Sequence, residues 1–319
     1  MRRRVLIALG ALVPVVALGL RFSLSPAAAQ PTDTRGFRLR SGLLGAARAL
    51  TAARVEAIER AQAEARRESA QKARVREQIL PMPDLTQTDP ALGVVGGGEA
   101  WCGPVAMSNA LAWLGANGRE MLLPAGEDAR SRQLELVRRL GSNRYMGTTP
   151  NGGTGTANLL KGLHAFLRDS GYGYRRLQYQ GWRGHPARFS TGIKSAELSF
   201  LRKALDDGGV AIIHAGWYTP SKYGDFYRRH GGHWLTVVGA GFDENGASRD
   251  DTFVVHDPAP YAGPEGAEHF VTLTRMEGGW LMAEDGAFPA RGFRRLEGGM
   301  KIKVPGDVAV LDGAVALVP

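Results

Sequence analysis

The chain contains a single cysteine, Cys102, which lies between Trp101 and the dipeptide Gly103-Pro104. A lone cysteine has no partner for an intramolecular disulfide, so the fold depends on its own hydrophobic core. Residues 81–319 are numerous enough for one well-buried domain. Cys102 is therefore a buried small side chain, an intermolecular cross-link or a nucleophile. A cross-linking cysteine suits an exposed loop better than the start of an apolar segment.

The N-terminus has the layout of a secretion signal. Residues 2–4 are arginines, residues 5–20 are apolar, and residues 27–29 are alanines of the kind that precede a cleavage site. We expect residues 1–29 to be a signal peptide and the protein to be secreted or periplasmic. An uncleaved N-terminal membrane anchor is the alternative, although the apolar stretch is shorter than the roughly 20 residues of a spanning helix.

The formal net charge is +9, and the whole excess comes from residues 1–80. Residues 81–319 contain equal numbers of basic and acidic residues, so the composition gives no support for nucleic acid as a partner. The segment of residues 30–80 is rich in the helix formers Ala, Arg, Glu and Gln over residues 41–80 and ends at a Pro-Met-Pro sequence. We predict a charged helical pro-segment or stalk there. Contact of this basic helix with a membrane surface, or use of it as a partner-binding scaffold, are further alternatives.

Within residues 81–319 helices come first and strands later, which predicts an α+β fold. The predicted helices are 105–114, 131–140, 158–169 and 196–206, the last capped by Ser195. The predicted strands are 210–218, 233–242, 252–256 and 269–274, followed by a β-rich C-terminal extension over residues 300–317. The turn sequence of residues 243–246 predicts that the strands before and after it are antiparallel neighbours.

Three residues form a candidate catalytic set. Cys102 lies where an apolar helix starts, and the free N–H groups and dipole of a helix N-terminus favour a thiolate. A nucleophilic cysteine needs a base, and the base needs an orienting group. His233 begins a predicted strand after two glycines, and Asp257 follows the next strand, so a carboxylate there is placed to accept the second imidazole N–H.

The segments WCGPVAMSNALAWL, GHWLTVVGAGFDENG and FVVHDPA resemble papain-like cysteine peptidases, in particular the branch of bacteriocin-leader-processing peptidases and their secreted relatives. The resemblance covers roughly residues 95–260. It implies a papain-like fold, in which a helix that begins at the cysteine packs on an antiparallel sheet that carries the histidine and the aspartate. It also implies that Cys102 is the nucleophile, His233 the general base and acid, and Asp257 the orienting residue. The Cys102 N–H would be one oxyanion donor, and no cofactor or metal is implied.

One segment departs from the family pattern. The family carries a glutamine several residues before the cysteine, and its side-chain amide completes the oxyanion hole. Here residues 96–101 are Gly-Gly-Gly-Glu-Ala-Trp, and the nearest upstream glutamine, Gln87, lies fifteen residues before Cys102. We expect the local geometry to keep Gln87 away from the site, which leaves a backbone N–H of the glycines as a substitute.

The sequence therefore predicts an exported thiol-dependent hydrolase, a cysteine peptidase that cleaves a peptide or protein substrate. An amidase acting on cell-wall peptides is one alternative. A catalytically inactive papain-like binding domain is another, and the missing glutamine favours it.

The other six histidines suit other roles. His214 lies in an apolar strand and is expected in the core, whereas His230 adjoins two arginines and is expected in a solvated loop. His256 is expected to point to the face opposite Asp257. The remaining three, His164, His185 and His269, lack metal-ligand spacing, so no structural zinc site is expected. Residues 151–156 predict a tight loop into a helix, and the aromatic residues between 217 and 227 either rim a cleft or belong to the core.

Overall fold

The structure is a computed structural model that describes residues 34–284 and 286–319; of residues 34–48 and 51 it describes the backbone. The expected signal peptide, and its alternative as an N-terminal anchor, fall on residues 1–29, outside the described residues. The chain divides into two compact units, Met1–Ala63 and Glu64–Pro319. Within the described residues, no helix combines the length and the apolar character needed to cross a membrane.

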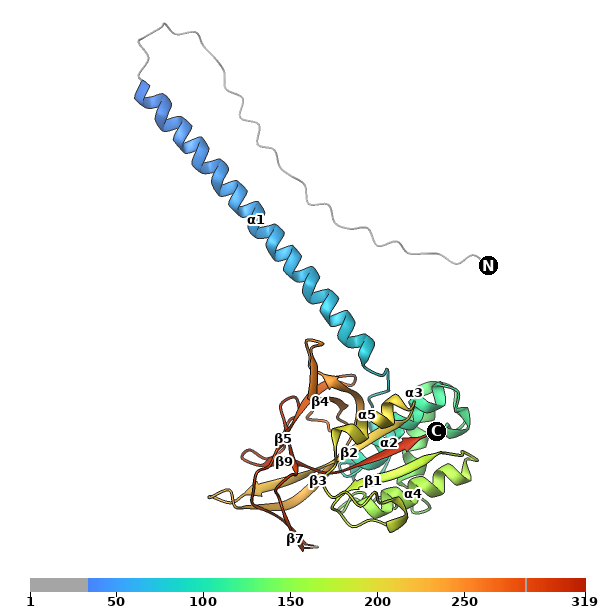
Figure 1. The fold of residues 1–319 in the computed structure, drawn as a ribbon. Helices are drawn as coiled ribbons and strands as arrows, with labels where there is room; N and C mark the ends of the chain where they lie inside the picture. The colour runs from blue at the N-terminus through green and yellow to red at the C-terminus, as the bar shows by residue number, and fades with distance from the viewer. Residues whose placement is uncertain (1–33, 285) are drawn as a thin grey trace, which may run out of the picture. The chain divides into compact units, whose positions relative to one another are not determined.

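Helix α1 runs from Thr34 to Gln78 (Figure 1), over most of the stretch where the composition predicts a helix. It stops short of Pro81, because proline disfavours helical backbone in the residue before it. Near its end, Val75 is buried and lies next to Gly246, and the Gln71 side chain donates a hydrogen bond to the carbonyl of Asn245. The last turns of α1 are therefore attached to the turn between two strands of the second unit. Its use as a pro-segment or a stalk stays a prediction.

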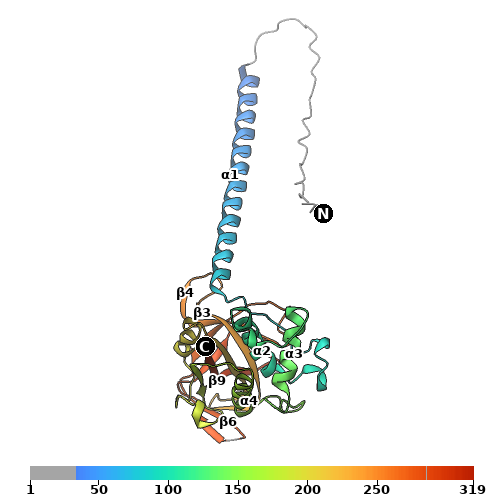
Figure 2. The ribbon, with the colours of Figure 1, turned by 90° about the vertical axis from the view of Figure 1, so that its right-hand side faces the viewer.

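Four further helices belong to the second unit: α2 (Cys102–Ala116), α3 (Ala129–Gly141), α4 (Thr156–Asp169) and α5 (Leu198–Asp206). All four coincide with predicted helices to within a few residues at each end. The cap of α5 was predicted wrongly, because Glu197 holds that position and the Ser195 hydroxyl instead donates to the carbonyl of Gly292. Figures 1 and 2 show α2, α3 and α4 on one side of the strands.

Nine strands form one sheet: β1 (Arg176–Gly181), β2 (Val210–Pro220), β3 (Phe226–Phe242), β4 (Ser248–His256), β5 (His269–Arg275), β6 (Trp280–Ala283), β7 (Gly286–Pro289), β8 (Arg294–Glu297) and β9 (Val308–Val318). Their order is β1-β9-β8-β5-β4-β3-β6-β7. All pairs are antiparallel except β3 with β6. Strand β2 pairs with both β3 and β9, which closes six strands into a ring. The fold is α+β, as predicted.

Two apolar cores lie on the two faces of the strands. Alternate residues of β2 show this division, because successive side chains of a strand point to opposite faces. Val210 and Ile212 pack with buried residues of α2 and α4, whereas Ala211 and Ile213 pack with residues of the other ring strands and of α5. The first core holds the helices on the sheet and so positions the start of α2 over β3.

The strands differ from the prediction in several respects, the first being that β1, β6, β7 and β8 were not predicted. Strand β3 begins at Phe226 rather than at His233, so His233 lies in mid-strand. The two glycines before it do not end the pairing, since Gly231 and Gly232 remain opposite Trp217 and Gly216 of β2. The predicted C-terminal β-rich segment is one strand, β9, which begins at Val308. The antiparallel pairing of β3 and β4 around residues 243–246 is confirmed.

Candidate active site

Cys102 is the first residue of α2 and is 8% exposed. Pro104 occupies the first turn, where a missing N–H costs no helical hydrogen bond. Gly103 is required by close packing, because a Cβ at this position would lie 2.9 Å from the Thr154 side chain. The first N–H groups of a helix have no partner within it and form the positive end of its dipole. The thiol therefore sits at the positive end of the α2 dipole, beside free N–H groups.

His233 lies on β3, and Asp257 follows the neighbouring strand β4. Strand β4 pairs with β3 through His256 and Thr236, and Asp257 follows directly, diagonal to His233. The distance from His233 Nε2 to Asp257 Oδ1 is 2.6 Å, and both side chains are almost fully buried. Asp257 Oδ1 also accepts a hydrogen bond from the N–H of Ala259 at 2.9 Å. The structure thus brings these two predicted site residues together.

The ionisation of the pair follows from burial and charge. Burial lowers the pKa of His233, but the charge and hydrogen bond of Asp257, and then the hydrogen bond and charge of Cys102, outweigh burial and raise this pKa to about 10. Burial raises the pKa of Asp257, whereas the charge and hydrogen bond of His233 hold that pKa below its usual value. Both directions favour an imidazolium between a carboxylate and a sulfur atom.

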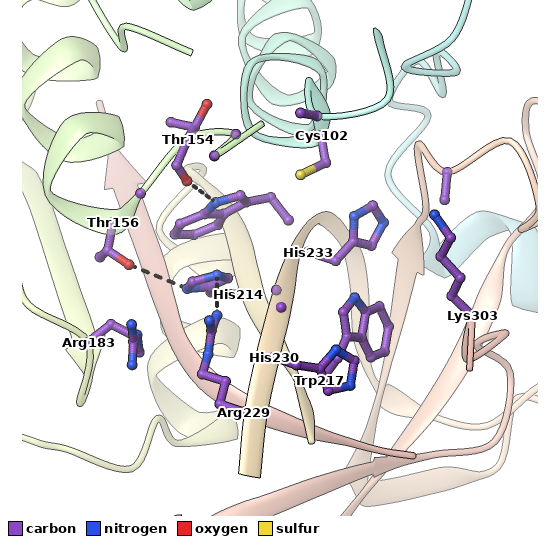
Figure 3. Close-up of a pocket in the computed structure, with 18 of the residues that line it drawn as sticks. Cys102, Thr154, Thr156, Arg183, His214, Trp217, Arg229, His230, His233 and Lys303 are labelled. Carbon is purple, nitrogen blue, oxygen red and sulfur yellow. Dashed lines mark hydrogen bonds between the residues drawn. The ribbon is translucent and has the colours of Figure 1, made fainter. Parts of the chain in front are cut away.

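The geometry also assigns the two imidazole nitrogens. Because Nε2 of His233 faces Asp257, Nδ1 is the nitrogen left for the thiol. Figure 3 shows the sulfur of Cys102 and the ring of His233 facing the same space. Trp217 stacks on the His233 ring with centroids 6.1 Å apart and planes 21° apart, which restricts rotation of the ring.

Gln87 lies in the same cleft as Cys102, so the expectation that it stays away was wrong. The intervening segment folds back on itself through glycines with positive φ at positions 93, 96, 97 and 98. Gly98 packs directly on Gln87, since a Cβ at Gly98 would lie 1.8 Å from the Gln87 carbonyl oxygen. The three consecutive glycines were the sequence signal for this return. The expectation treated separation along the chain as separation in space.

The Gln87 side chain is 4% exposed and held by one hydrogen bond. Its Nε2 donates to the carbonyl oxygen of Glu99 at 2.6 Å. Within the described residues, its Oε1 is buried without a hydrogen-bond partner. A buried polar atom without a partner lowers stability, and a role of this amide in the cleft would explain its position.

The cleft has a volume of about 850 Å³, within the range of ligand-binding pockets. Figure 3 shows side chains that line it. Its walls comprise residues 151–158 at the start of α4, residues 229–234 of β3, residues 259–261 after Asp257, and residues 302–304 between β8 and β9. Residues 151–155 form the predicted loop into a helix, which Gly155 caps. The two glycine-rich walls, 152–153 and 231–232, leave backbone groups accessible to an extended substrate.

A buried polar network lies at the base of the cleft. Burial lowers the pKa of His214 well below its usual value, with nearby Arg229 acting in the same direction, so the ring is neutral. Arg229 faces His214 Nε2 at 3.3 Å and can only donate, so this nitrogen is the acceptor and Nδ1 donates to Thr156. Arg229 also pairs with the fully buried Asp312 at 2.6 Å. His214 is a satisfied core residue, as predicted.

The other histidines and aromatic residues singled out in the sequence lie partly in the cleft and partly outside it. His230 belongs to strand β3 rather than to a loop, and its Nε2 lies 2.6 Å from Asp307 Oδ2 at the cleft. His256 is buried, and its Nδ1 lies 3.2 Å from the carbonyl oxygen of Pro83. The aromatic residues divide: Trp217 lines the cleft, Tyr218 is buried, and Tyr223 and Phe226 are exposed.

Over residues 34–284 and 286–319, no group of three or more His, Cys, Asp or Glu side chains is placed to hold a metal ion. Comparisons of the chain with models of known protein families, with curated proteins and with solved structures find no match.

Proposed function

We propose that this protein is a thiol-dependent hydrolase with a papain-like arrangement, and that it cleaves peptide bonds through an acyl-enzyme on Cys102. One observation carries the proposal: a cysteine at a helix N-terminus shares a cleft with a histidine whose far nitrogen is bound by a buried carboxylate. A structural cysteine needs neither the histidine nor the carboxylate. Nucleophilic catalysis needs both.

In the proposed reaction the Cys102 thiolate attacks the substrate carbonyl carbon. The His233 imidazolium then gives its Nδ1 proton to the leaving amine, and the C–N bond breaks to leave a thioester on Cys102. The neutral His233 next takes a proton from water, which attacks the thioester and releases the acid. Asp257 keeps Nε2 occupied throughout, so that Nδ1 is the nitrogen that exchanges protons.

The proposed oxyanion donors are the Cys102 N–H and the Gln87 amide. A carboxamide nitrogen carries two hydrogens. One hydrogen of the Gln87 amide is donated to the backbone carbonyl oxygen of Glu99. The second is available to a negative oxygen in the cleft. Gln87 lines the same cleft as Cys102, which supports an active hydrolase over the alternative of an inactive binding domain.

A covalent probe tests this proposal. We expect an irreversible thiol-directed acyl probe to add one mass increment to the intact protein, and to lose this labelling in both Cys102→Ala and His233→Ala. The matched control is His164→Ala, which removes a histidine that bonds Tyr174 outside the cleft. Labelling of His233→Ala at the wild-type rate would show that Cys102 does not depend on the histidine, and the proposal would fail.

The pattern of residues 1–29 supports export to the cell envelope, where the substrate would be a peptide or a protein. We propose this location together with the activity, and fractionation of cells that express the full chain tests it. Recovery of the protein in the cytoplasm with residues 1–29 intact would contradict it.

A further inference from the structure

The loop between β8 and β9, residues 298–307, forms one wall of the cleft. Three consecutive residues of this loop, Ile302, Lys303 and Val304, line the cleft together with Cys102 and His233. Ile302 and Val304 are 36% and 46% exposed, although both are large and apolar. Exposed apolar side chains at the mouth of a site indicate contact with a ligand. The loop is bounded by glycines with positive φ at positions 298, 299 and 306, which other residues adopt at a cost.

Lys303 differs from the other basic side chains of the cleft. Arg229 is paired with Asp312, His230 with Asp307, and Arg183 lies 4.9 Å above the Trp182 ring. For the Lys303 ammonium, the described residues provide neither an ion pair nor a hydrogen bond. Two carboxylates, Glu99 and Glu284, also line the cleft. An ion pair between Lys303 and Glu99 or Glu284 is the alternative role for Lys303, and a test has to exclude it.

The position of Lys303 in the cleft indicates which part of a substrate it would contact. Figure 3 shows Lys303 on the same side of the cleft as Trp217 and His233. In a thiol hydrolase the histidine protonates the leaving amine, so the leaving part of the substrate lies on the histidine side of the cysteine. The loop therefore borders the leaving part, with an ammonium flanked by two apolar side chains.

We infer that Lys303 binds a carboxylate on the leaving part of the substrate, so that the enzyme prefers an acidic group just after the cleaved bond. The inference rests on the proposed thiol hydrolase activity. The carboxylate has two possible sources, an acidic side chain or the chain-terminal carboxylate of a short leaving peptide. Ile302 and Val304 pack beside the carbon chain of the same group, since an apolar surface accommodates the stem of a charged side chain.

A pair of small reagents tests the inference without a known substrate. Iodoacetate and iodoacetamide alkylate the same thiol and differ by one carboxylate charge. We expect the ratio of their rates at Cys102 to fall about threefold in Lys303→Met and to be retained in Lys303→Arg, since one partly exposed ion pair is worth less than about tenfold. Lys301→Met is the matched control, because Lys301 is exposed on the same loop and does not line the cleft.

Peptides then distinguish the two sources of the carboxylate. A peptide cut by the wild type is compared with versions that carry Glu or Gln after the cleaved bond, each with a free or an amidated C-terminus. A side-chain site predicts a preference for Glu that Lys303→Met loses, and a terminal site predicts a preference for the free acid.

The outcomes separate this inference from the proposed function. Slow reaction of wild-type Cys102 with both reagents contradicts the proposed function. Fast reaction with a rate ratio that is the same in Lys303→Met contradicts the role of Lys303. If Lys303→Met changes all rates equally, Lys303 acts through Glu99 or Glu284 and the inference is wrong.

Discussion

Replacing Asp257 by asparagine should lower the pKa of His233. The pKa of His233 is raised from 6.5 to about 10, and Asp257 supplies the largest of the effects that raise it. This change corresponds to roughly 5 kcal/mol in favour of the imidazolium, since one pH unit is about 1.4 kcal/mol. An opposite charge in contact accounts for about 1–3 pH units. Asp257→Asn should therefore lower the pKa of His233 by about 1–3 pH units.

The assay is nuclear magnetic resonance of protein labelled with nitrogen-15 in its histidines, titrated between pH 6 and pH 11. The His233 signal is assigned by its loss in His233→Ala. In the wild type we expect the ring to stay protonated until about pH 10 and in Asp257→Asn to lose its proton earlier. Asp251→Asn is the control, because Asp251 is a half-buried carboxylate on β4, the strand that Asp257 follows, and it pairs with Arg249. An unchanged His233 titration in Asp257→Asn would refute the reasoning.

The same shifts predict how the pair contributes to folding stability. Folded His233 holds its proton more tightly than an unfolded histidine, so its contribution is complete below about pH 6.5 and is lost as the pH rises through about 10. The pKa of Asp257 is lowered in the folded state, so its contribution is present above its ordinary value and lost as the pH falls. Urea unfolding at several pH values should show the stability advantage of the wild type over Asp257→Asn disappear at both extremes.

Three further substitutions have defined expectations. Gln87→Ala should lower turnover about 10²–10³-fold while alkylation of Cys102 stays at the wild-type rate, because an oxyanion donor acts in the transition state; equal losses in both assays would contradict this. Gly98→Ala should destabilise the protein by about 1–3 kcal/mol more than Gly97→Ala, as measured by urea unfolding. A Cβ at Gly98 would clash with the Gln87 backbone, whereas a Cβ at Gly97 would meet nothing within 4 Å. Asp312→Ala should cost roughly 3–5 kcal/mol in the same assay, because it removes the buried carboxylate that pairs with Arg229, and a loss below about 1 kcal/mol would count against that pairing.

Local patterns in the sequence predicted the elements that carry the site. The apolar segment after Cys102 and the strand before Asp257 are both read from short-range periodicity, and the turn at residues 243–246 sets β3 beside β4. The contact between Asp257 and His233 follows from the pairing of β3 with β4, because Asp257 comes directly after His256, the residue opposite Thr236. The α+β class follows from the order of helices and strands.

The remaining features depend on contacts between distant parts of the chain. Closure of the strand ring requires β2 to meet β9, and no local pattern predicts that pairing. The position of Gln87 depends on how residues 88–98 turn back, which four positive-φ glycines determine together. The cleft wall at Lys303 lies outside the stretch that resembles papain-like peptidases, so the resemblance carried no expectation for it.

The most direct test of the proposed peptidase activity is the appearance of new peptide termini in a complex peptide mixture. The purified protein, as wild type and as Cys102→Ala, is incubated with peptides from a digested proteome, and new N-termini are identified by mass spectrometry. We predict a set of cleavages present with the wild type and lost with Cys102→Ala. A wild type that takes the acyl probe on Cys102 yet produces no new terminus would contradict the peptidase assignment and favour an amidase acting on cell-wall peptides.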